Sequence, residues 1–507
     1  MNLGEPMSSR EEGCNKSMNG KEQPEIGHWQ SDYPIVSEKS MKVDGEKGTA
    51  AVRCEARDTP ARHRTGQQVS TKLASLTSRA RRKPKGKFNS LMHLLTEEFL
   101  MGCYRELKRD KSPGIDGMRM EEYGDNLEDN IRGLVGRLKA RRYRSQPVKR
   151  VYIPKTDGTR RGLGIPTIED KVVQMGIKKI LEAIYEVDFM GVSYGFRPHR
   201  SSHDALDAVN EAIMAKPINA VVDMDIRKYF DTIDHRWMMK MLRERVTDTS
   251  LLKLIGKFLR AGVMEEGRVE ETDKGTPQGG VLSPLLANIY LHYVLDLWFE
   301  RKVKKQLRGY AQLIRYADDF IVCFQAKKEA EEFGEELRQR LSRFGLEVAE
   351  DKSRIIEFGR YEKKKAQREG RKVATFNFLG ITHYCATGKA GKFKLGRSTE
   401  RARYWRKMEG MNQWLKGVRS TVELRELWQT LRQKLVGHYR YYGIGGNSRK
   451  VSAFYHETVK LVYKWINRRS QKRSYNWEQF QRLLKYNPLP KPKIYHPYPV
   501  VSARMHC

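Results

Sequence analysis

The stretch Tyr316-Ala317-Asp318-Asp319 decides the fold expected for this chain. It lies between two apolar runs, Leu313-Ile314 and Phe320-Ile321-Val322, a pattern that predicts a strand, a tight turn and a second strand. Such a hairpin carries two adjacent carboxylates at its tip, where their oxygens can hold a hard divalent cation. An Asp-Asp pair alone is more often a solvated turn, so its interpretation depends on the motifs that accompany it.

A second carboxylate follows another strand-like run upstream, residues 219–226, which contains Asp225 near its end. Two strands that each end in an aspartate can share two Mg²⁺ ions about 3.5–4 Å apart, the arrangement that drives in-line phosphoryl displacement. We therefore expect Asp225, Asp318 and Asp319 to be the catalytic residues and Mg²⁺ ligands, with Asp319 as the supporting carboxylate beside the other two. The neighbouring acidic residues are expected to be ordinary surface or turn carboxylates: Asp223, Asp231 and Asp234.

Further motifs accompany these carboxylates in a fixed order. They are SPGIDG at 112–117, VYIPK at 151–155, RGLGIPT at 161–167, SYGFRP at 193–198, DIRKYF at 225–230, GTPQGG at 275–280 with SPLLAN at 283–288, GLE at 345–347 with Lys352, and FNFLG at 376–380. Over roughly the last four fifths of the chain, this set resembles group II intron-encoded reverse transcriptase/maturases. The resemblance implies an α+β right-hand polymerase fold, with fingers and a palm built on an antiparallel sheet, followed by an α-helical thumb or X domain.

The resemblance also implies an activity. An RNA-directed DNA polymerase of this family is a nucleotidyltransferase that uses two Mg²⁺ ions. It binds its parent group II intron RNA, assists splicing and copies the intron into DNA at a target site, so the expected partners are intron RNA, target DNA with its primer, and dNTPs. Two alternatives stay open: a domesticated defence or CRISPR-associated reverse transcriptase, and an RNA-binding splicing cofactor alone. The intact carboxylates argue against the cofactor alternative.

Four residues are expected to contact the incoming nucleotide. In RNA-copying RNA polymerases the resembled pattern places a second Asp five residues after the first; here that residue is Phe230, whose ring would crowd a 2′-OH and favour DNA as product. By resemblance, Gln278 packs at the nucleotide sugar, in a glycine-rich loop that permits close approach. Lys155 and Arg161 flank a short turn and would both face a triphosphate. Each has a structural alternative: Phe230 could be a core aromatic, the loop of Gln278 could be a turn without function, and Lys155 and Arg161 could be solvated cations.

Two groups of residues are expected to contact nucleic acid. The first belongs to the resembled FNFLG motif: Phe378, Leu379 and Gly380. The second is a basic run after the helical region: Arg468, Arg469, Lys472 and Arg473. Interleaved aromatic residues could either stack on unpaired bases or pack the helices against one another, and both interpretations stay open: His438, Tyr439, Tyr441 and Tyr442.

The composition agrees with a nucleic-acid partner. There are 97 Lys and Arg against 62 Asp and Glu, which gives a net charge of +35. No apolar run of about 18 residues or lipidation motif favours a membrane. The six cysteines are scattered without close pairs, which predicts a reducing compartment, here the bacterial cytoplasm or the nucleoid when bound to DNA. Without paired cysteines we also expect no endonuclease module.

Four segments are expected along the chain. Residues 1–85 are polar, end in a basic run and are expected to be disordered, whereas residues 86–388 should form the fingers and palm. Residues 389–475 should form the thumb or X domain, with three helices within 397–471. Residues 476–507 are expected to be an extended, Pro-rich basic tail that could be a short DNA-binding remnant.

Overall fold

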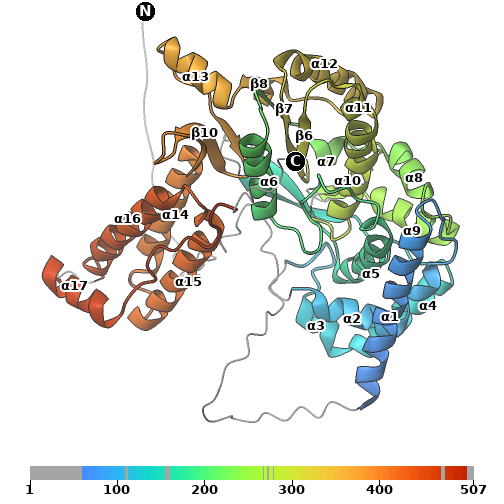
Figure 1. Cartoon of the computed structure of the whole chain (residues 1–507). Helices are drawn as coiled ribbons and strands as arrows, with labels where there is room; N and C mark the ends of the chain where they lie inside the picture. The colour runs from blue at the N-terminus through green and yellow to red at the C-terminus, as the bar shows by residue number, and fades with distance from the viewer. Residues whose placement is uncertain are drawn as a thin grey trace, which may run out of the picture. The chain divides into compact units, whose positions relative to one another are not determined.

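The computed structural model describes residues 60–108, 112–154, 160–265, 268–270, 273–277, 279–469 and 474–499 (Figure 1). Four of the residues selected above lie outside these ranges: Lys155, Gln278, Lys472 and Arg473. The same holds for residues 1–59 and 500–507. All described residues belong to one unit of the chain, which begins at Ala56.

A four-stranded antiparallel sheet carries the carboxylate motifs. Its order is β6-β7-β3-β8, formed by Ala311–Tyr316, Asp319–Phe324, Ala220–Met224 and Arg354–Glu357. The apolar residues of β7 are buried, and helix α12 (Lys327–Arg343) packs against β3, β7 and β8. Figure 1 shows α12 beside these strands. The hairpin expected around Asp318 is therefore confirmed, as is the mixed α+β class.

A second sheet has the order β2-β1-β4-β5. Its strands are Arg160–Ile165, Val148–Pro154, Val263–Glu265 and Arg268–Glu270. In the sequence, β1 and β2 come before the first sheet, and β4 and β5 lie between its strands β3 and β6. β1 and β2 form an antiparallel hairpin, and β1 pairs with β4 in parallel. Helix α5 (Ile168–Tyr185) follows β2 directly, because Thr167 caps it by accepting a hydrogen bond from Asp170 N.

The other helices of this region surround the two sheets. They are α2 (Glu97–Glu106), α3 (Met120–Asp125), α4 (Leu127–Lys139), α6 (Ser202–Ala215), α7 (Tyr229–Thr232), α8 (His235–Arg243), α9 (Thr249–Leu259), α10 (Ser283–Leu291), α11 (Lys304–Gln306) and α13 (Arg360–Arg368). Short 3₁₀ turns lie at Met92–Leu94 and Glu350–Lys352, and π-helical turns lie at His292–Asp296 and Phe299–Val303.

Helix α1 (Pro60–Arg82) corrects the expectation of disorder up to residue 85. It packs against α2 and α5, with Ala80 buried and Leu73 and Leu76 partly buried against the core. The Arg79 guanidinium lies 5.0 Å from the centre of the Phe88 ring. Positions 73, 76 and 80 form a helical stripe that is narrow enough to be hidden by the polar composition around it.

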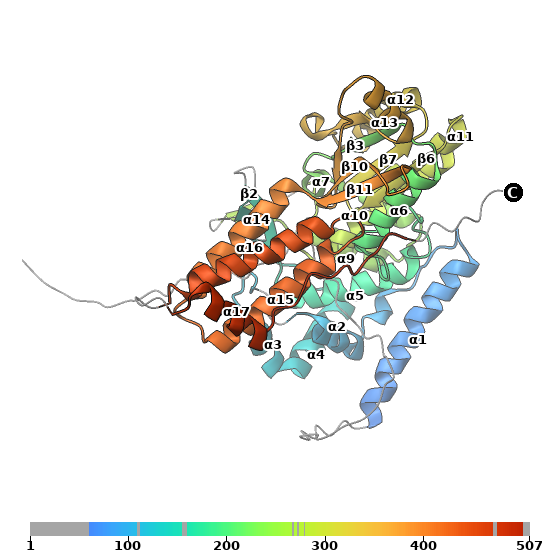
Figure 2. The ribbon, with the colours of Figure 1, turned by 60° about the vertical axis from the view of Figure 1, so that its left-hand side comes forward.

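A third sheet, of order β11-β10-β9, leads into the C-terminal helices. Its strands are Phe393–Thr399, Ile381–Thr387 and Phe376–Phe378. Helices α14 (Arg401–Val418), α15 (Leu424–Tyr442) and α16 (Ser448–Ile466) follow and lie side by side in Figures 1 and 2. The three helices expected within 397–471 are confirmed, although the first residues of that range belong to β11. We call α14–α16 the helical bundle.

The segment after the bundle is not wholly extended. Asn476 caps helix α17 (Trp477–Tyr486) by accepting a hydrogen bond from Gln479 N, and the Gln479 side chain accepts one from Asn476 N. The expectation of an extended tail from residue 476 is therefore wrong for this helix. A capping box with an aromatic residue at its first helical position was present in the sequence as a signal.

Residues 487–498 are extended and join the bundle to the third sheet; we call them the C-terminal strap. Its hydrogen bonds run from Trp428 Nε1 to Asn487 O at 2.8 Å, from Tyr439 Oη to Pro490 O at 3.0 Å, from Gly445 N to His496 O at 2.7 Å, and from Tyr498 Oη to Leu395 O at 2.8 Å. These backbone and side-chain groups of the strap are hydrogen-bonded to other parts of the same chain. The proline-rich composition thus has a structural role here.

Candidate functional site

The tip of the β6–β7 hairpin presents the adjacent aspartates. Tyr316 pairs with Asp319, which leaves Ala317 and Asp318 as a two-residue turn. Ala317 has φ of 60°, in the left-handed region that the tight turn requires. Continuing the β3–β7 register by one pair places Asp225 opposite Asp319. The structure therefore brings the three expected metal ligands to the same end of one sheet.

The carboxylates are close enough to affect one another. Burial raises the pKa of Asp319 to about 8, and the negative charges of Asp318, Asp223 and Asp225 add to this increase, while Arg403 opposes it. Burial also raises the pKa of Asp318, and Asp225 contributes in the same direction. Such mutual destabilisation of like charges is the electrostatic condition that a bound cation relieves.

Cations approach the carboxylates from three parts of the chain. Arg161, an exposed residue of β2, lowers the pKa of Asp318, so the β1–β2 hairpin presents positive charge to the turn. Arg403 comes from α14 of the helical bundle and lowers the pKa of Asp319. Lys352 Nζ lies 4.0 Å from Asp225 Oδ2. The sequence motifs selected Arg161 but gave no indication of Arg403.

The donor set suits a hard divalent ion. Its atoms are carboxylate oxygens on a turn and at a strand end, which Mg²⁺ prefers. Asp225 keeps a side chain that is 42% exposed, whereas Asp318 and Asp319 are half-buried. Across the described ranges, no set of three or more His, Cys, Asp or Glu side chains is already gathered closely enough to hold a metal. The carboxylates therefore fit Mg²⁺ in type and lie at the same end of one sheet, but their side chains are not gathered into a preformed metal site.

Asp223 is not a plain surface carboxylate, and that expectation is wrong. Its side chain is 18% exposed, and its Oδ2 lies 3.3 Å from Arg354 Nε on the paired strand β8. Because side chains alternate along a strand, Asp223 and Asp225 share one face of the sheet. The other two acidic residues are as expected: Asp231 is exposed, and Asp234 caps α8.

The glycine-rich loop docks against the backbone of Phe230. Thr276 N donates a 2.7 Å hydrogen bond to Phe230 O, and a Cβ at Gly275, which has φ of 90°, would lie 3.1 Å from the same carbonyl oxygen. Gly279, with φ of 115°, would place a Cβ 2.7 Å from Gly164 O of β2. The fold therefore brings half-buried Phe230, the loop and the β1–β2 hairpin together. Gln278 and Lys155 belong to these elements but lie outside the described residues.

The FNFLG motif forms a tight turn between β9 and β10. Leu379 and Gly380 both have positive φ, at 52° and 75°. Phe378 and Leu379 are each 1% exposed, and Leu379 O accepts a hydrogen bond from Tyr441 Oη. Their side chains are therefore packed in the core and cannot contact nucleic acid, which corrects that expectation. Contact at this turn is left to its backbone and to Gly380, which lies against Arg403.

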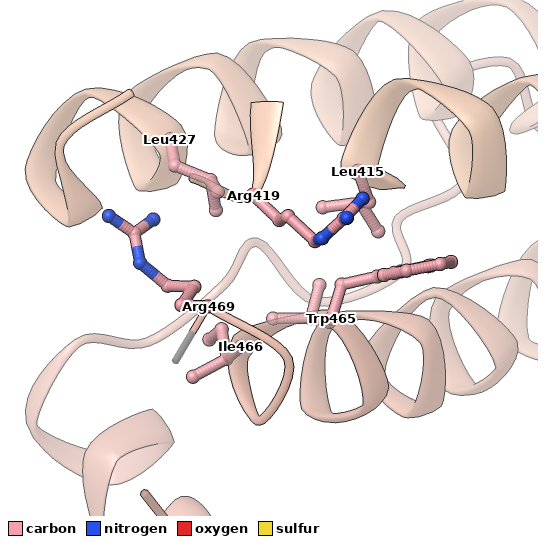
Figure 3. Close-up of a pocket in the computed structure, with 7 residues that line it drawn as sticks. Leu415, Arg419, Leu427, Trp465, Ile466 and Arg469 are labelled. Carbon is pink, nitrogen blue, oxygen red and sulfur yellow. The ribbon is translucent and has the colours of Figure 1, made fainter. Parts of the chain in front are cut away.

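The basic residues at the end of α16 have different surroundings. Arg468 is exposed and lies over the Trp465 ring at 5.4 Å. Arg469 is half-buried, donates from Nη2 to Val422 O at 2.9 Å, and lines a narrow space in the bundle with Arg419 (Figure 3). Arg469 is thus a structural residue of the bundle, and Arg468 is the better candidate for a phosphate contact.

The aromatic residues of α15 mostly pack the bundle. His438, Tyr439 and Tyr442 are buried, and the His438 ring stacks on Phe454 at 3.7 Å between ring centres. Tyr441 is half-buried, and its hydroxyl binds the FNFLG turn. Of the two interpretations that the sequence left open, packing holds for these residues.

Comparison with known proteins agrees with this arrangement. The family model described as "Reverse transcriptase (RNA-dependent DNA polymerase)" matches residues 153–383. Protein YkfC of Escherichia coli K12 is 32% identical over 321 residues, which cover 57% of this chain and 84% of that protein. The chain belongs to the reverse transcriptase family. This membership rests on the two sequence matches.

Other matches share a smaller part of their length with this chain. The group II intron-encoded protein LtrA of Lactococcus lactis is 38% identical over 213 residues, which cover 42% of this chain but 35% of LtrA. Among solved structures, apo telomerase from Candida tropicalis superposes with a TM-score of 0.41 at 14% identity, over 68% of this chain and 62% of that one. The relation to intron-encoded proteins is thus limited to the shared segment.

Two further observations concern the setting of the protein. No helix in the described ranges is both long and apolar enough to cross a membrane. Three cysteines within those ranges are free thiols, and burial raises the pKa of each of them: Cys103, Cys323 and Cys385.

Proposed function

We propose that this reverse transcriptase is a Mg²⁺-dependent RNA-directed DNA polymerase that binds its parent group II intron RNA, assists its splicing and copies it into DNA at a target site. One observation carries the polymerase part. Asp225, Asp318 and Asp319 meet at the end of one sheet, beside Phe230 and the glycine-rich loop. A right-hand division follows, with β1–β2 in the fingers, the β6-β7-β3-β8 sheet as palm and the helical bundle as thumb or X domain.

Each group at the site would have a separate task. Asp225 and Asp318 would hold two Mg²⁺ ions, which would supply charge stabilisation for nucleotidyl transfer. In that reaction a primer 3′-hydroxyl loses its proton and bonds to the α-phosphorus of a dNTP, while the bond from that phosphorus to the β-phosphate breaks and pyrophosphate leaves. Asp319 supports the turn that carries Asp318. Arg161, which already faces Asp318, would bind the triphosphate, with Lys155 beside it on the same hairpin.

The sugar and base would lie against the other side of the site. Phe230 would exclude a 2′-OH, and Gln278 would position the sugar from the loop that docks on the Phe230 backbone. Gly275 and Gly279 keep that loop close to α7 and β2, since both have a positive φ and a Cβ would lie 3.0 Å from Asp231 O at Gly275 and 2.7 Å from Gly164 O at Gly279. The loop and Phe230 would therefore act as one surface.

The intron part of the proposal depends on two supports. LtrA is by name a group II intron-encoded protein, and the alignment with it runs through the shared segment. The chain also has a net charge of +35, which favours a large polyanion. A splicing cofactor without polymerase activity is disfavoured, because the three aspartates are all present and lie at the same end of one sheet.

The metal assignment is tested by Asp225→Asn and Asp318→Asn. An amide is a neutral and poor ligand for Mg²⁺, so primer extension should fall by about 100-fold or more while RNA binding is kept. Asp231→Asn, at an exposed position of the same helix-turn region, is the control and should keep its activity. Full extension activity in the Asp225 or the Asp318 variant would show that the metal ligands are other residues.

The RNA surface is tested with a triple variant in which each of three basic residues is changed to Gln: Arg468, Lys472 and Arg473. Intron RNA binding should weaken, and the slope of log affinity against log salt should decrease by about 1 for each phosphate that the variant no longer neutralises. Extension on a short annealed template at low salt should change much less. The control changes three exposed cations elsewhere to Gln: Arg301, Lys302 and Lys305. An equal change of slope in both variants would mean that net charge alone is responsible.

A further inference from the structure

Arg315 is a fully buried arginine two residues before the catalytic turn. Its five guanidinium contacts are Nε to Asp296 Oδ1 at 2.7 Å, Nη2 to Asp296 Oδ2 at 2.5 Å, Nη2 to Ser193 Oγ at 2.8 Å, Nη1 to Asn288 Oδ1 at 2.9 Å and Nη1 to Ala317 O at 2.8 Å. Both Arg315 and Asp296 are 0% exposed. One side chain thus joins the helical segment of Asn288 and Asp296, and the segment of Ser193, to the turn that carries Asp318.

The backbone of Arg315 is held by Val192 and by the SYGFRP motif that follows it. Arg315 N donates to Val192 O at 2.9 Å, and Tyr194 N donates to Arg315 O at 2.8 Å, so Ser193 forms a single parallel bridge with Arg315 beside β6. A Cβ at Gly195 would overlap Ala317 N and lie 2.9 Å from Tyr316 C. The glycine therefore lets the segment pass directly beneath the turn.

The segment beneath the turn is itself fixed. Asn288 Nδ2 donates to Gly195 O at 2.7 Å. Arg197, which is buried, donates from Nη1 to the carbonyls of Met190 and Ser193 at 2.7 Å each and pairs with Glu186. The SYGFRP motif has no part in the metal and nucleotide binding proposed above. What the structure shows for it is close contact with the turn that carries Asp318.

Stability alone does not account for this arrangement. A buried ion pair is costly to desolvate, and well-packed apolar residues can replace such pairs without loss of stability. A guanidinium differs from an apolar side chain in its rigid fork of five donors, which fixes the relative positions of all its acceptors. Here one of those acceptors is Ala317 O, in the left-handed residue next to Asp318.

We propose that Arg315, Ser193, Asn288 and Gly195 form a clamp that positions the Ala317-Asp318 turn and thereby sets where the Asp318 carboxylate meets the metal. These are positioning residues, because none of them is placed to touch substrate or metal. The inference rests on the proposed function of Asp318 as a metal ligand. It assigns a role to the SYGFRP motif and to a buried charge pair that the polymerase mechanism does not otherwise use.

The test compares Gly195→Ala with Gly191→Ala in the full-length protein. The new methyl group at residue 195 must displace the turn, whereas a Cβ at Gly191 has no atom within 4 Å, apart from its chain neighbours. Since a displacement of about 1 Å can cost about 100-fold in rate, we expect kcat of Gly195→Ala to fall by about 10- to 100-fold. KM for dNTP and for primer-template should stay within about twofold.

A second readout separates positioning from general damage. Mn²⁺ binding to the nucleotide-free protein, followed by electron paramagnetic resonance, and the Mg²⁺ concentration for half-maximal extension should both shift to weaker binding in Gly195→Ala. A smaller folded fraction would lower kcat without moving either value, and that result would overturn the proposal. The proposal would also be overturned if Gly195→Ala behaved as Gly191→Ala does.

If Gly195→Ala fails to fold, Ser193→Ala is measured instead. This variant removes one acceptor from Arg315, so the Mn²⁺ affinity and the Mg²⁺ concentration for half-maximal extension should both shift, but by less. The clamp is overturned if neither value shifts.

The clamp can fail without the failure of the proposed function. Inactive Asp318→Asn together with an unaltered Gly195→Ala would keep the metal ligand and reject the clamp. Active Asp318→Asn would reject the metal ligand and the clamp together. Arg315→Lys keeps the charge but removes the fork, so it should resemble Gly195→Ala in its weaker metal binding.

Discussion

Phe230 occupies the position that we propose to select the sugar, and its surroundings in the fold support that proposal over simple packing. Its carbonyl is the anchor for the glycine-rich loop, and its ring lies edge-on to Tyr229 at 5.4 Å while remaining half-buried. A residue that served only the core would be expected to bury its ring as Tyr229 does, at 2% exposure. The accessible part of the ring is available to a nucleotide.

Phe230→Ala should therefore relax sugar selection and permit incorporation of ribonucleotides. Removing the ring opens the space that a 2′-OH needs, so the ratio of rNTP to dNTP incorporation should rise. Single-nucleotide incorporation kinetics with matched dNTP and rNTP measure it, with Tyr229→Phe as the control. A purely structural Phe230 would instead cost about 3–5 kcal/mol of stability on truncation and lower all incorporation at a constant ratio.

The sequence identified individual site residues where the signal was local. Asp318 and Asp319 are adjacent and flanked by apolar strands, so both the hairpin and its carboxylates could be predicted. Asp223 could not be distinguished from a surface residue, because its partner Arg354 is 131 positions away. Arg315 likewise takes its partners from positions 2 to 122 residues away. An arginine inside the apolar run of a strand was the available signal, since such a charge must be paired when buried.

At the scale of elements, helices with wide apolar stripes were predictable and short or narrow ones were not. α14, α15 and α16 each repeat apolar residues over many turns, and their number was predicted correctly. α1 has a narrow stripe, and α17 is short, so polar and Pro-rich surroundings concealed both. The FNFLG motif was assigned to nucleic-acid contact by resemblance, but its two-residue turn requires the side chains to pack inward against β10.

Packing within the bundle gives a prediction for His438→Phe. Burial lowers the pKa of His438 to about 3, with a further decrease from Lys407, and both ring nitrogens lack a hydrogen-bond partner in the described structure. Its folded pKa is below the unfolded value of about 6.5, so the unfolded state binds the extra proton and this residue destabilises the fold as pH falls below about 6.5. Phenylalanine cannot take up that proton.

The stability of His438→Phe relative to the wild type should therefore increase as the pH falls. Between pH 7.5 and pH 5 the relative gain should be about 2 kcal/mol, measured by urea unfolding at each pH. Because all other titrating groups are shared, their contributions cancel in the difference. A difference that is constant with pH would mean that His438 titrates normally in the folded protein.

At the scale of the whole molecule, the C-terminal strap is the connection that local sequence patterns could not reveal. It contacts α15, the turn at Gly443–Gly446 and strand β11, and the His496 ring stacks on His203 of α6 at 3.6 Å between ring centres. The Tyr498 ring lies 4.3 Å from the guanidinium of buried Arg397. A segment that the sequence left open as a short DNA-binding remnant thus joins the bundle to the sheets through these contacts.

Removal of the strap should loosen the bundle while leaving the catalytic sheet folded. A chain ended after Asn487 lacks the hydrogen bonds to Tyr439, Gly445 and Leu395, each worth about 0.5–1.5 kcal/mol net, together with the two ring interactions. We expect a lower melting temperature and new proteolytic cleavage near residues 443–447, where the strap now covers the backbone. A chain ended after residue 499 is the matched control, because it keeps the whole strap. Equal melting and equal cleavage of the two truncated proteins would show that the strap lies on the bundle without stabilising it, and the bundle would then be held by its own helical packing alone.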